Sequence, residues 1–186
     1  MTDPRLAIFK QLLLAWNEKI NLIGPGATKA IDAHIDEALR AAELLEPVGE
    51  VLDFGSGGGL PAIPMAIAAP AAHFHLVEAD QKKWAFLKRA VRECGLNAQI
   101  HGDRLARILP RLPADLRLTL VTSRAVGRPE EWLPSLKPFL SRGSKIGLFQ
   151  RGSSAPAIAG FDVAAVEPLP RGTGNSLVTL MFHVEQ

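Results

Sequence analysis

Apolar residues in the first fifty positions recur at steps of three and four, which places them along one side of a helix. One such stripe covers residues 6–20 and a second covers residues 31–45. The intervening residues 21–28 contain two glycines and a proline, so we expect a loop there, with Thr28 capping the second helix. The pattern therefore predicts two N-terminal helices before any strand.

After residue 50 the pattern changes to short β-type runs that alternate with helical segments. The expected strands cover residues 51–54, 74–78, 97–101, 118–122 and 145–149. The helices expected between them cover residues 60–69, 82–94, 103–109 and 130–140. Strands that alternate with helices predict an α/β fold, in which a parallel sheet carries helices on both faces.

The C-terminal part departs from this alternation. Residues 161–166 and 176–184 are both β-rich, and only the turn-rich residues 168–174 separate them. Two strands without an intervening helix predict an antiparallel pair at one edge of the sheet. The sheet is then mostly parallel and has seven strands.

The length of 186 residues suits a single domain that spans residues 1–186. Within it, residues 1–48 are expected to form a helical extension and residues 49–186 a cofactor-binding core. A hydrophobic content of 47% and a charged content of 22% are typical of a globular protein. The formal net charge of +2 permits a nucleic-acid partner, but no block of Lys and Arg demands one.

Three features indicate a cytoplasmic location and no membrane. Cys94 is the only cysteine, so it cannot form an internal disulfide, which favours a reducing compartment. The first residues lack the basic start and apolar run of a signal peptide. The longest apolar stretch, residues 60–72, is too short to cross a bilayer and contains three prolines.

A glycine-rich loop follows the first expected strand, with the sequence Gly-Ser-Gly-Gly-Gly at residues 55–59. We expect Gly55 and Gly57 to let a ligand approach the backbone closely at this end of the sheet. Leu60 and a proline follow where a P-loop has Lys and Ser or Thr, which excludes a Walker-type NTPase. Counted from Gly57, the loop fits the dinucleotide pattern, so by itself it permits either a dinucleotide or S-adenosylmethionine.

Three acidic residues lie at the carboxyl ends of successive expected strands, and this arrangement favours S-adenosylmethionine. Asp53 precedes the first glycine by two residues and can reach, directly or through water, the ammonium group that dinucleotides lack. Glu78 ends the second strand and is placed to accept ribose hydroxyls, a role that NAD would use as well. Asp103, after the third strand, lies where the adenine edge would be read, or else caps the next helix.

Several motifs together resemble the RsmG (GidB) family of bacterial small-subunit ribosomal RNA methyltransferases. They are residues 21–23 and 34–39, the extended glycine loop 52–64, the basic-aromatic run 82–87 and Ser-Arg-Ala at 123–125. The resemblance implies the Rossmann-like fold of class I methyltransferases and S-adenosylmethionine as cofactor. It also implies an enzyme that methylates N7 of a guanine in 16S ribosomal RNA.

The resemblance assigns further roles to individual residues. It implies that Gly55 and Leu60 contact the cofactor from the loop and that Leu105 and Ala106 flank its adenine. Arg124 matches the family's arginine at the end of the fourth strand, where we expect it to position cofactor or substrate; an ordinary salt bridge is the alternative. Guanine N7 carries a lone pair and no proton, so we expect no residue to act as a general base.

The predicted RNA contacts are basic residues near the same end of the sheet, namely Lys82, Lys83, Arg128 and Arg151. Arg151 stands where the family commonly has a lysine, which keeps the charge but replaces a point charge with a planar group. The lysines lie on a helix whose charges can equally form an ordinary solvated face. We expect 16S ribosomal RNA or the small ribosomal subunit as the partner of a monomeric protein.

The remaining candidate residues are histidines and tryptophans. His34 either faces the substrate or sits at an internal interface. His73 and His75 alternate along the second strand, and with no further ligand visible beside them in the sequence we expect no metal site. The tryptophans fall on apolar helical stripes and are expected to pack in the core.

Two rival functions remain at this point. A small NAD-binding oxidoreductase would use the same loop, but the chain has no tyrosine and hence no Tyr-Lys hydride relay. A non-catalytic module that binds RNA or the ribosome on the same fold would not need the acids and glycines described above. Both are weaker than a methyltransferase.

Overall fold

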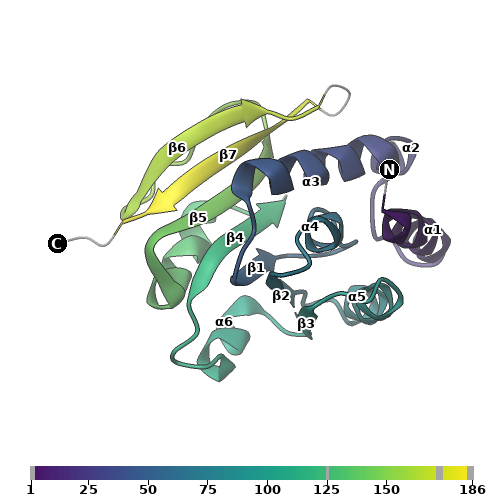
Figure 1. Cartoon of the computed structure of the whole chain (residues 1–186), viewed down its shortest axis with the longest axis horizontal. Helices are drawn as coiled ribbons and strands as arrows, with labels where there is room; N and C mark the ends of the chain where they lie inside the picture. Colours follow the sequence, from purple (N-terminus) through teal and green to yellow (C-terminus); the bar gives the residue numbers. More distant parts are fainter. Residues whose placement is uncertain (1–2, 125, 171–173, 184–186) are drawn as a thin grey trace.

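The computed structural model describes residues 3–124, 126–170 and 174–183. Its centre is one seven-stranded sheet with the order β3-β2-β1-β4-β5-β7-β6 (Figure 1). The strands are β1 (Glu50–Phe54), β2 (His73–Val77), β3 (Ala98–His101), β4 (Leu118–Arg124), β5 (Leu140–Arg151), β6 (Phe161–Pro168) and β7 (Asn175–Phe182). The first five strands pair in parallel, whereas β7 pairs antiparallel with both β5 and β6. This confirms the predicted sheet with its antiparallel edge.

Helices cover both faces of the sheet (Figure 1). The helices are α1 (Pro4–Asn17), α2 (Pro25–Lys29), α3 (Ile31–Leu45), α4 (Ala62–Ala68), α5 (Gln81–Glu93), α6 (Leu105–Ile108) and α7 (Pro129–Trp132), with 3-10 turns η1 (Leu109–Arg111) and η2 (Leu133–Phe139). One apolar core joins α1, α3, α4 and α5 to the sheet, and another joins α6, α7 and η2 to its other face. Among the described residues, no helix has the length and apolar character needed to cross a membrane.

The N-terminal helices differ from the expected pattern in two details. The expected loop at residues 21–28 contains the start of the short helix α2, which Pro25 opens at its first position. Thr28 lies inside α2 and donates its hydroxyl to the carbonyl of Gly24, so its predicted role as the cap of the next helix is wrong. Ala30 caps α3 without a side-chain hydrogen bond.

The segment expected as one helix at residues 130–140 forms a single α turn followed by the 3-10 turn η2. Prolines inside this segment, including Pro138, have no N–H to donate to an α-helical ladder, which explains the tighter and shorter turns. The end of the last predicted strand, at residue 184, and part of the predicted turn at residues 168–174 lie outside the described residues.

The strand order creates a crevice between β1 and β4. From β1 the chain proceeds outward to β2 and β3, and then returns to place β4 on the other side of β1. The connections that leave β1 and β4 therefore diverge, and ligands of open α/β sheets bind at such a switch point, beyond the carboxyl ends of the strands. The glycine loop follows β1 at this edge, and Arg124 ends β4 there.

Candidate cofactor site

The glycine loop turns back on the sheet through backbone conformations that favour glycine. Gly55 has a φ of 76° and Gly59 a φ of 80°, and the amides of Gly55 and Ser56 both donate to the carbonyl of Val77 at 3.0 Å. A Cβ on Gly55 would overlap the side chain of Val126. The loop is thus anchored to the end of β2 with no space for a side chain at Gly55.

Asp53 is buried beneath the loop, with 1% of its surface exposed. Its Oδ1 accepts a hydrogen bond of 2.6 Å from Thr122 on the neighbouring strand, whereas its Oδ2 has no partner. Burial raises the pKa of Asp53 to about 6, against the opposing effects of the Thr122 hydroxyl and the Arg124 charge. A buried acceptor without a partner, next to a loop that can approach a ligand, is the feature expected beneath a ligand's cation.

Glu78 follows β2 and closes over the loop. Its Oε2 accepts from the amide of Gly57 at 2.9 Å, and its Oε1 accepts from the amide of Asp80 at 2.8 Å. Asp80 in turn caps α5 through the amides of Lys82 and Lys83. The carboxylate of Glu78 therefore faces the crevice from a fixed turn between β2 and α5.

Arg124 belongs to a polar cluster that connects α3 with the carboxyl end of the sheet. Its Nη2 donates to Glu37 Oε2 at 2.8 Å, and its guanidinium lies 4.9 Å from the centre of the Phe149 ring. Glu37 is fully buried, and its Oε1 accepts from Asn175 at the start of β7 at 2.8 Å. Burial lowers the pKa of Arg124, and the charge of Glu37 opposes this shift.

His34 completes the same cluster. Its Nδ1 lies 2.9 Å from Glu37 Oε2 and 3.1 Å from Arg124 Nη1, so it can donate to the carboxylate or accept from the guanidinium, but not both at once. Arg124 was predicted either to position a ligand or to form a salt bridge, and His34 either to face the substrate or to lie at an internal interface. The arrangement is compatible with both alternatives, because each residue takes part in the cluster and also lines the cavity described next. Arg124 Nε is buried without a partner.

A cavity of about 1040 Å³, called here the cofactor cavity, lies above these residues. Its walls come from the segment before α3, the glycine loop, the ends of β4 and β5, and the start of β7. The predicted site residues in its lining are Gly55, Gly57, Leu60, Glu78, Arg124, Lys83 and Arg151. Most of the predicted loop and strand-end residues therefore meet around one space.

Other predicted residues, among them the buried Asp53, lie outside this lining. Lys82 and Arg128 are exposed, and Arg128 forms an ion pair of 3.7 Å with Glu131. Asp103 pairs with Arg107 and Arg111 at 3.7 and 3.6 Å, and the cap of α6 is Arg104. Leu105 is buried and Ala106 is exposed on α6. The adenine contacts predicted for Asp103, Leu105 and Ala106 remain predictions.

The structure also adds residues that the sequence did not single out for the site. Trp132, expected only to pack, does pack against Phe54 with ring centres 4.8 Å apart, but it also lines the cofactor cavity. Asn175 and Gln150 reach the cavity from β7 and β5. No sequence signal identified Asn175, because its approach depends on the antiparallel return of β7 beside β5.

Solved structures with the same fold include methyltransferases. An O-methyltransferase, TomG from Streptomyces achromogenes, in complex with S-adenosylmethionine matches with a TM-score of 0.67 over 98% of this chain and 92% of that chain, at 14% identity. A mutant of MtNAS in complex with S-adenosylmethionine matches with a TM-score of 0.67 over 96% of this chain and 74% of that chain, also at 14% identity. The fold is therefore the Rossmann-like fold of class I methyltransferases, as predicted.

Sequence relatives identify the family, whereas the solved structures above identify only the fold. Residues 3–157 match the family model GidB, described as rRNA small subunit methyltransferase G. The ribosomal RNA small subunit methyltransferase G of Wolinella succinogenes is 35% identical over 149 residues, which cover 80% of this chain and 74% of the relative. The protein of the same name from Granulibacter bethesdensis is 36% identical over 158 residues, which cover 83% of this chain and 70% of the relative. The chain thus belongs to the GidB family, the family of rRNA small subunit methyltransferase G.

Proposed function

We propose that this chain transfers a methyl group from S-adenosylmethionine to N7 of a guanine in 16S ribosomal RNA, and that the donor occupies the cofactor cavity. The observation that carries the proposal is the convergence of the glycine loop, Glu78 and Arg124 around one cavity in a member of this family, with the buried, unpartnered Oδ2 of Asp53 at the end of the strand that leads into the loop. The rival NAD-binding oxidoreductase would need a hydride relay, and the chain has no tyrosine for a Tyr-Lys relay.

The residues present suit the cofactor. Asp53 Oδ2 is a buried acceptor without a partner, which fits the ammonium group of the methionine part, directly or through water. Arg124 Nε is a buried donor without a partner, which fits a carboxylate. Glu78 can exchange the amide of Gly57 for ribose hydroxyls, while Gly55 and Leu60 contact the donor from the loop.

The adenine contacts of the proposal are Asp103, Leu105 and Ala106. They follow β3, which pairs with β2, and the amide of Glu78 donates to the carbonyl of His101 at 3.0 Å. The turn after β3 is thereby held next to the ribose-binding carboxylate. Asp103 lines a second cavity, of about 640 Å³, and Leu105 and Ala106 follow it at the start of α6.

The chemistry requires positioning more than proton transfer. S-adenosylmethionine supplies an electrophilic methyl group, and guanine N7 offers an in-plane lone pair without a proton. Glu37 is hydrogen-bonded to both Arg124 and His34. Because these contacts fix the side chains in place, the cluster suits a role in holding ligands. We therefore assign Arg124 as a positioning residue and name no general base.

The target guanine must be reached outside a regular RNA duplex. The major groove of A-form RNA is too deep and narrow for side chains, so N7 is accessible in a loop, at an end or in a splayed base. Lys83 and Arg151 line the cofactor cavity and Lys82 and Arg128 lie exposed, so these four residues are the proposed contacts to RNA phosphates. The proposal places a monomeric protein in the cytoplasm, where ribosomal subunits are assembled.

A direct test combines small ribosomal subunits that lack the modification with methyl-labelled S-adenosylmethionine. We expect the label at one guanine, and we expect it to stay on the RNA after the protein is removed. Chemical treatment that cleaves RNA at N7-methylguanosine should cut the chain at this nucleotide. Label on another base position, or none on RNA while S-adenosylmethionine binds in calorimetry, would reject the substrate. Binding of NAD in place of S-adenosylmethionine would reject the cofactor, and light scattering would test the monomer.

A further inference from the structure

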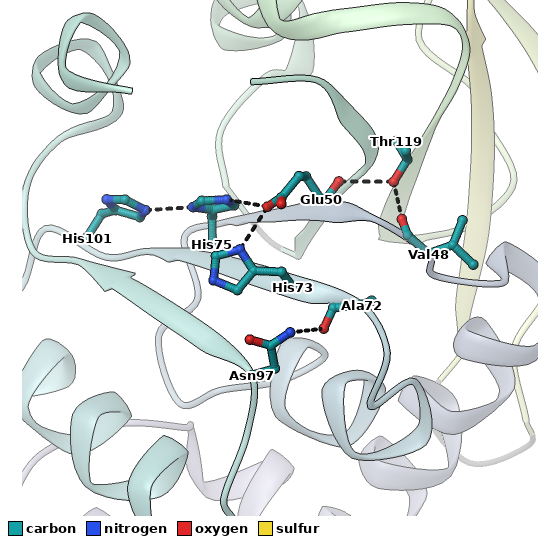
Figure 2. A network of polar contacts seen from close by, with 8 residues as sticks. All are labelled: Val48, Glu50, Ala72, His73, His75, Asn97, His101 and Thr119. Atoms are coloured by element: carbon teal, nitrogen blue, oxygen red, sulfur yellow. Dashed lines mark hydrogen bonds and ion pairs between the residues drawn. The ribbon is translucent and has the colours of Figure 1, made fainter. Parts of the chain in front are cut away.

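A second group of polar side chains lies across β1, β2 and β3, among residues that do not line the cofactor cavity (Figure 2). Glu50 opens β1, and His73 and His75 come from β2, where residues two apart share one face of the sheet. Glu50 Oε2 lies 2.8 Å from His73 Nδ1 and 2.8 Å from His75 Nε2. One carboxylate oxygen is thus shared by two imidazole rings.

The sequence shows no further ligand beside His73 and His75, but parallel pairing in the sheet places Glu50 directly beside His73. One potential ligand atom from each of the three residues lies within 4.8 Å of the other two. Two imidazoles and one carboxylate form a ligand set that zinc uses when it keeps a fourth position for water.

The group opens into a cavity of about 640 Å³ that is separate from the cofactor cavity. The two cavities share no lining residue. His75 is buried, with 5% of its side chain exposed, whereas Glu50 and His73 are 35% and 32% exposed. A metal ion can therefore reach the group from solvent, and two of the three side chains are free to adjust around it.

We propose that Glu50, His73 and His75 bind a divalent transition-metal ion, with Zn²⁺ as the best match, and with water in the fourth position. Zinc–ligand bonds of about 2.0–2.1 Å in a tetrahedron set neighbouring ligand atoms roughly 3.3 Å apart. The present separations from Glu50 Oε2 to the two histidine nitrogens are 2.8 Å, so each of these two distances would lengthen by roughly half an ångström around the ion.

His101 provides the supporting contact that a zinc-bound histidine usually has. Its Nε2 lies 3.0 Å from His75 Nδ1, and the two rings stack with centres 5.3 Å apart. When His75 Nε2 binds a metal, its Nδ1–H can donate to His101 Nε2, which fixes the ring orientation. The Thr119 hydroxyl lies between the backbone carbonyls of Val48 and Glu50 and can donate to either one, which links the start of β1 to β4 (Figure 2).

The charges around the site also permit a cation. Besides the ligands and His101, the charged residues that line the same cavity are Asp103 and Arg111. These two form an ion pair of 3.6 Å with each other, so the positive charge of Arg111 is partly compensated. Because the ligands join β1 to β2 and His101 adds β3, the bound ion would stabilise this half of the sheet.

The test uses the full chain without an affinity tag, stripped by a chelator and dialysed against Zn²⁺ alone. We expect one Zn²⁺ per chain and a rise in Tm of about 5–10 °C at a hundredfold excess over Kd. His73→Gln should weaken binding more than about 100-fold, and His101→Gln about 10- to 100-fold. His183→Gln, a matched change at a histidine elsewhere, should leave zinc binding unchanged.

Three results would overturn the proposal: no saturable binding, unchanged binding in His73→Gln, or loss of binding in His183→Gln. Glu50→Gln serves as a second ligand variant if His73→Gln does not fold, as judged by circular dichroism. The visible spectrum of bound Co²⁺ reports the geometry, and a tetrahedral signature is expected. Binding of S-adenosylmethionine is measured separately, so failure at this site leaves the proposed methyltransferase function untouched.

Discussion

Replacing Asp53 with asparagine removes a negative charge from a fully buried position without changing the size of the side chain. The folded protein holds the proton of this carboxyl group up to about pH 6, because burial raises its pKa, whereas the unfolded chain releases it near 3.8. The folded state therefore binds more protons in this window, and the free energy of unfolding of the wild-type protein falls as pH rises from about 4 to 6.

The magnitude follows from these two pKa values. A difference of about two pH units is worth roughly 3 kcal/mol at neutral pH. The asparagine amide would stand where Oδ2 has no partner, and an unpaired buried donor costs about 1–2 kcal/mol at every pH. Asp53→Asn should thus be more stable than the wild type by about 1–2 kcal/mol at pH 7.5, or roughly 2–8 °C in Tm. Near pH 4 the variant should be less stable than the wild type, because the folded wild-type protein then holds Asp53 in its neutral form and only the cost of the unpaired amide remains.

Urea denaturation at several pH values measures this difference directly. The difference in free energy of unfolding between variant and wild type should change by roughly 3 kcal/mol between pH 4 and pH 7.5. The same variant should bind S-adenosylmethionine roughly 10- to 100-fold more weakly in calorimetry, because it lacks the charge that faces the ammonium group. Asp36→Asn, at an exposed position of α3, should change neither quantity measurably.

Two outcomes would refute this reasoning. A stability difference that is independent of pH would mean that Asp53 is ionised normally in the folded protein. Unchanged affinity for S-adenosylmethionine in a folded Asp53→Asn protein would mean that the ammonium group does not lie above this carboxylate, and the proposed orientation of the donor would be wrong.

Three further changes test other parts of the site. Gly55→Ala should lower the affinity for S-adenosylmethionine at least about tenfold, because the added methyl group meets Val126. Gly143→Ala has a similar φ of 87° but lies in open space, and it should leave the affinity unchanged. Equal losses in the two variants would contradict the role of the loop. Glu37→Gln should destabilise the protein by about 2–4 kcal/mol in urea, and Glu43→Gln, in an exposed pair on the same helix, by under about 0.5 kcal/mol. Arg151→Ala should reduce the slope of log K against log salt by about 1 in RNA-binding titrations, and an unchanged slope would remove Arg151 from the RNA contacts.

Several features of the site could be predicted because they are local in the sequence. A strand that runs into four glycines within five residues predicts a ligand-binding turn, and Asp53 and Glu78 lie at fixed short distances from strand ends. The antiparallel edge was predictable for the same reason, since two β-rich runs follow each other without a helix. Prolines limited the accuracy at residues 130–140, where the apolar pattern alone suggested a longer helix.

The sequence by itself determined the order of strands and helices, the position of the glycine loop and the acids beside it, because these depend on neighbouring residues and on short periods. Only the tertiary structure decided which distant side chains meet. Glu37, Arg124 and Asn175 join across α3, β4 and β7, and Glu50 joins His73 and His75 across β1 and β2. Such contacts depend on strand order and register, which hydrogen bonding between separate strands fixes and which no spacing along the chain records.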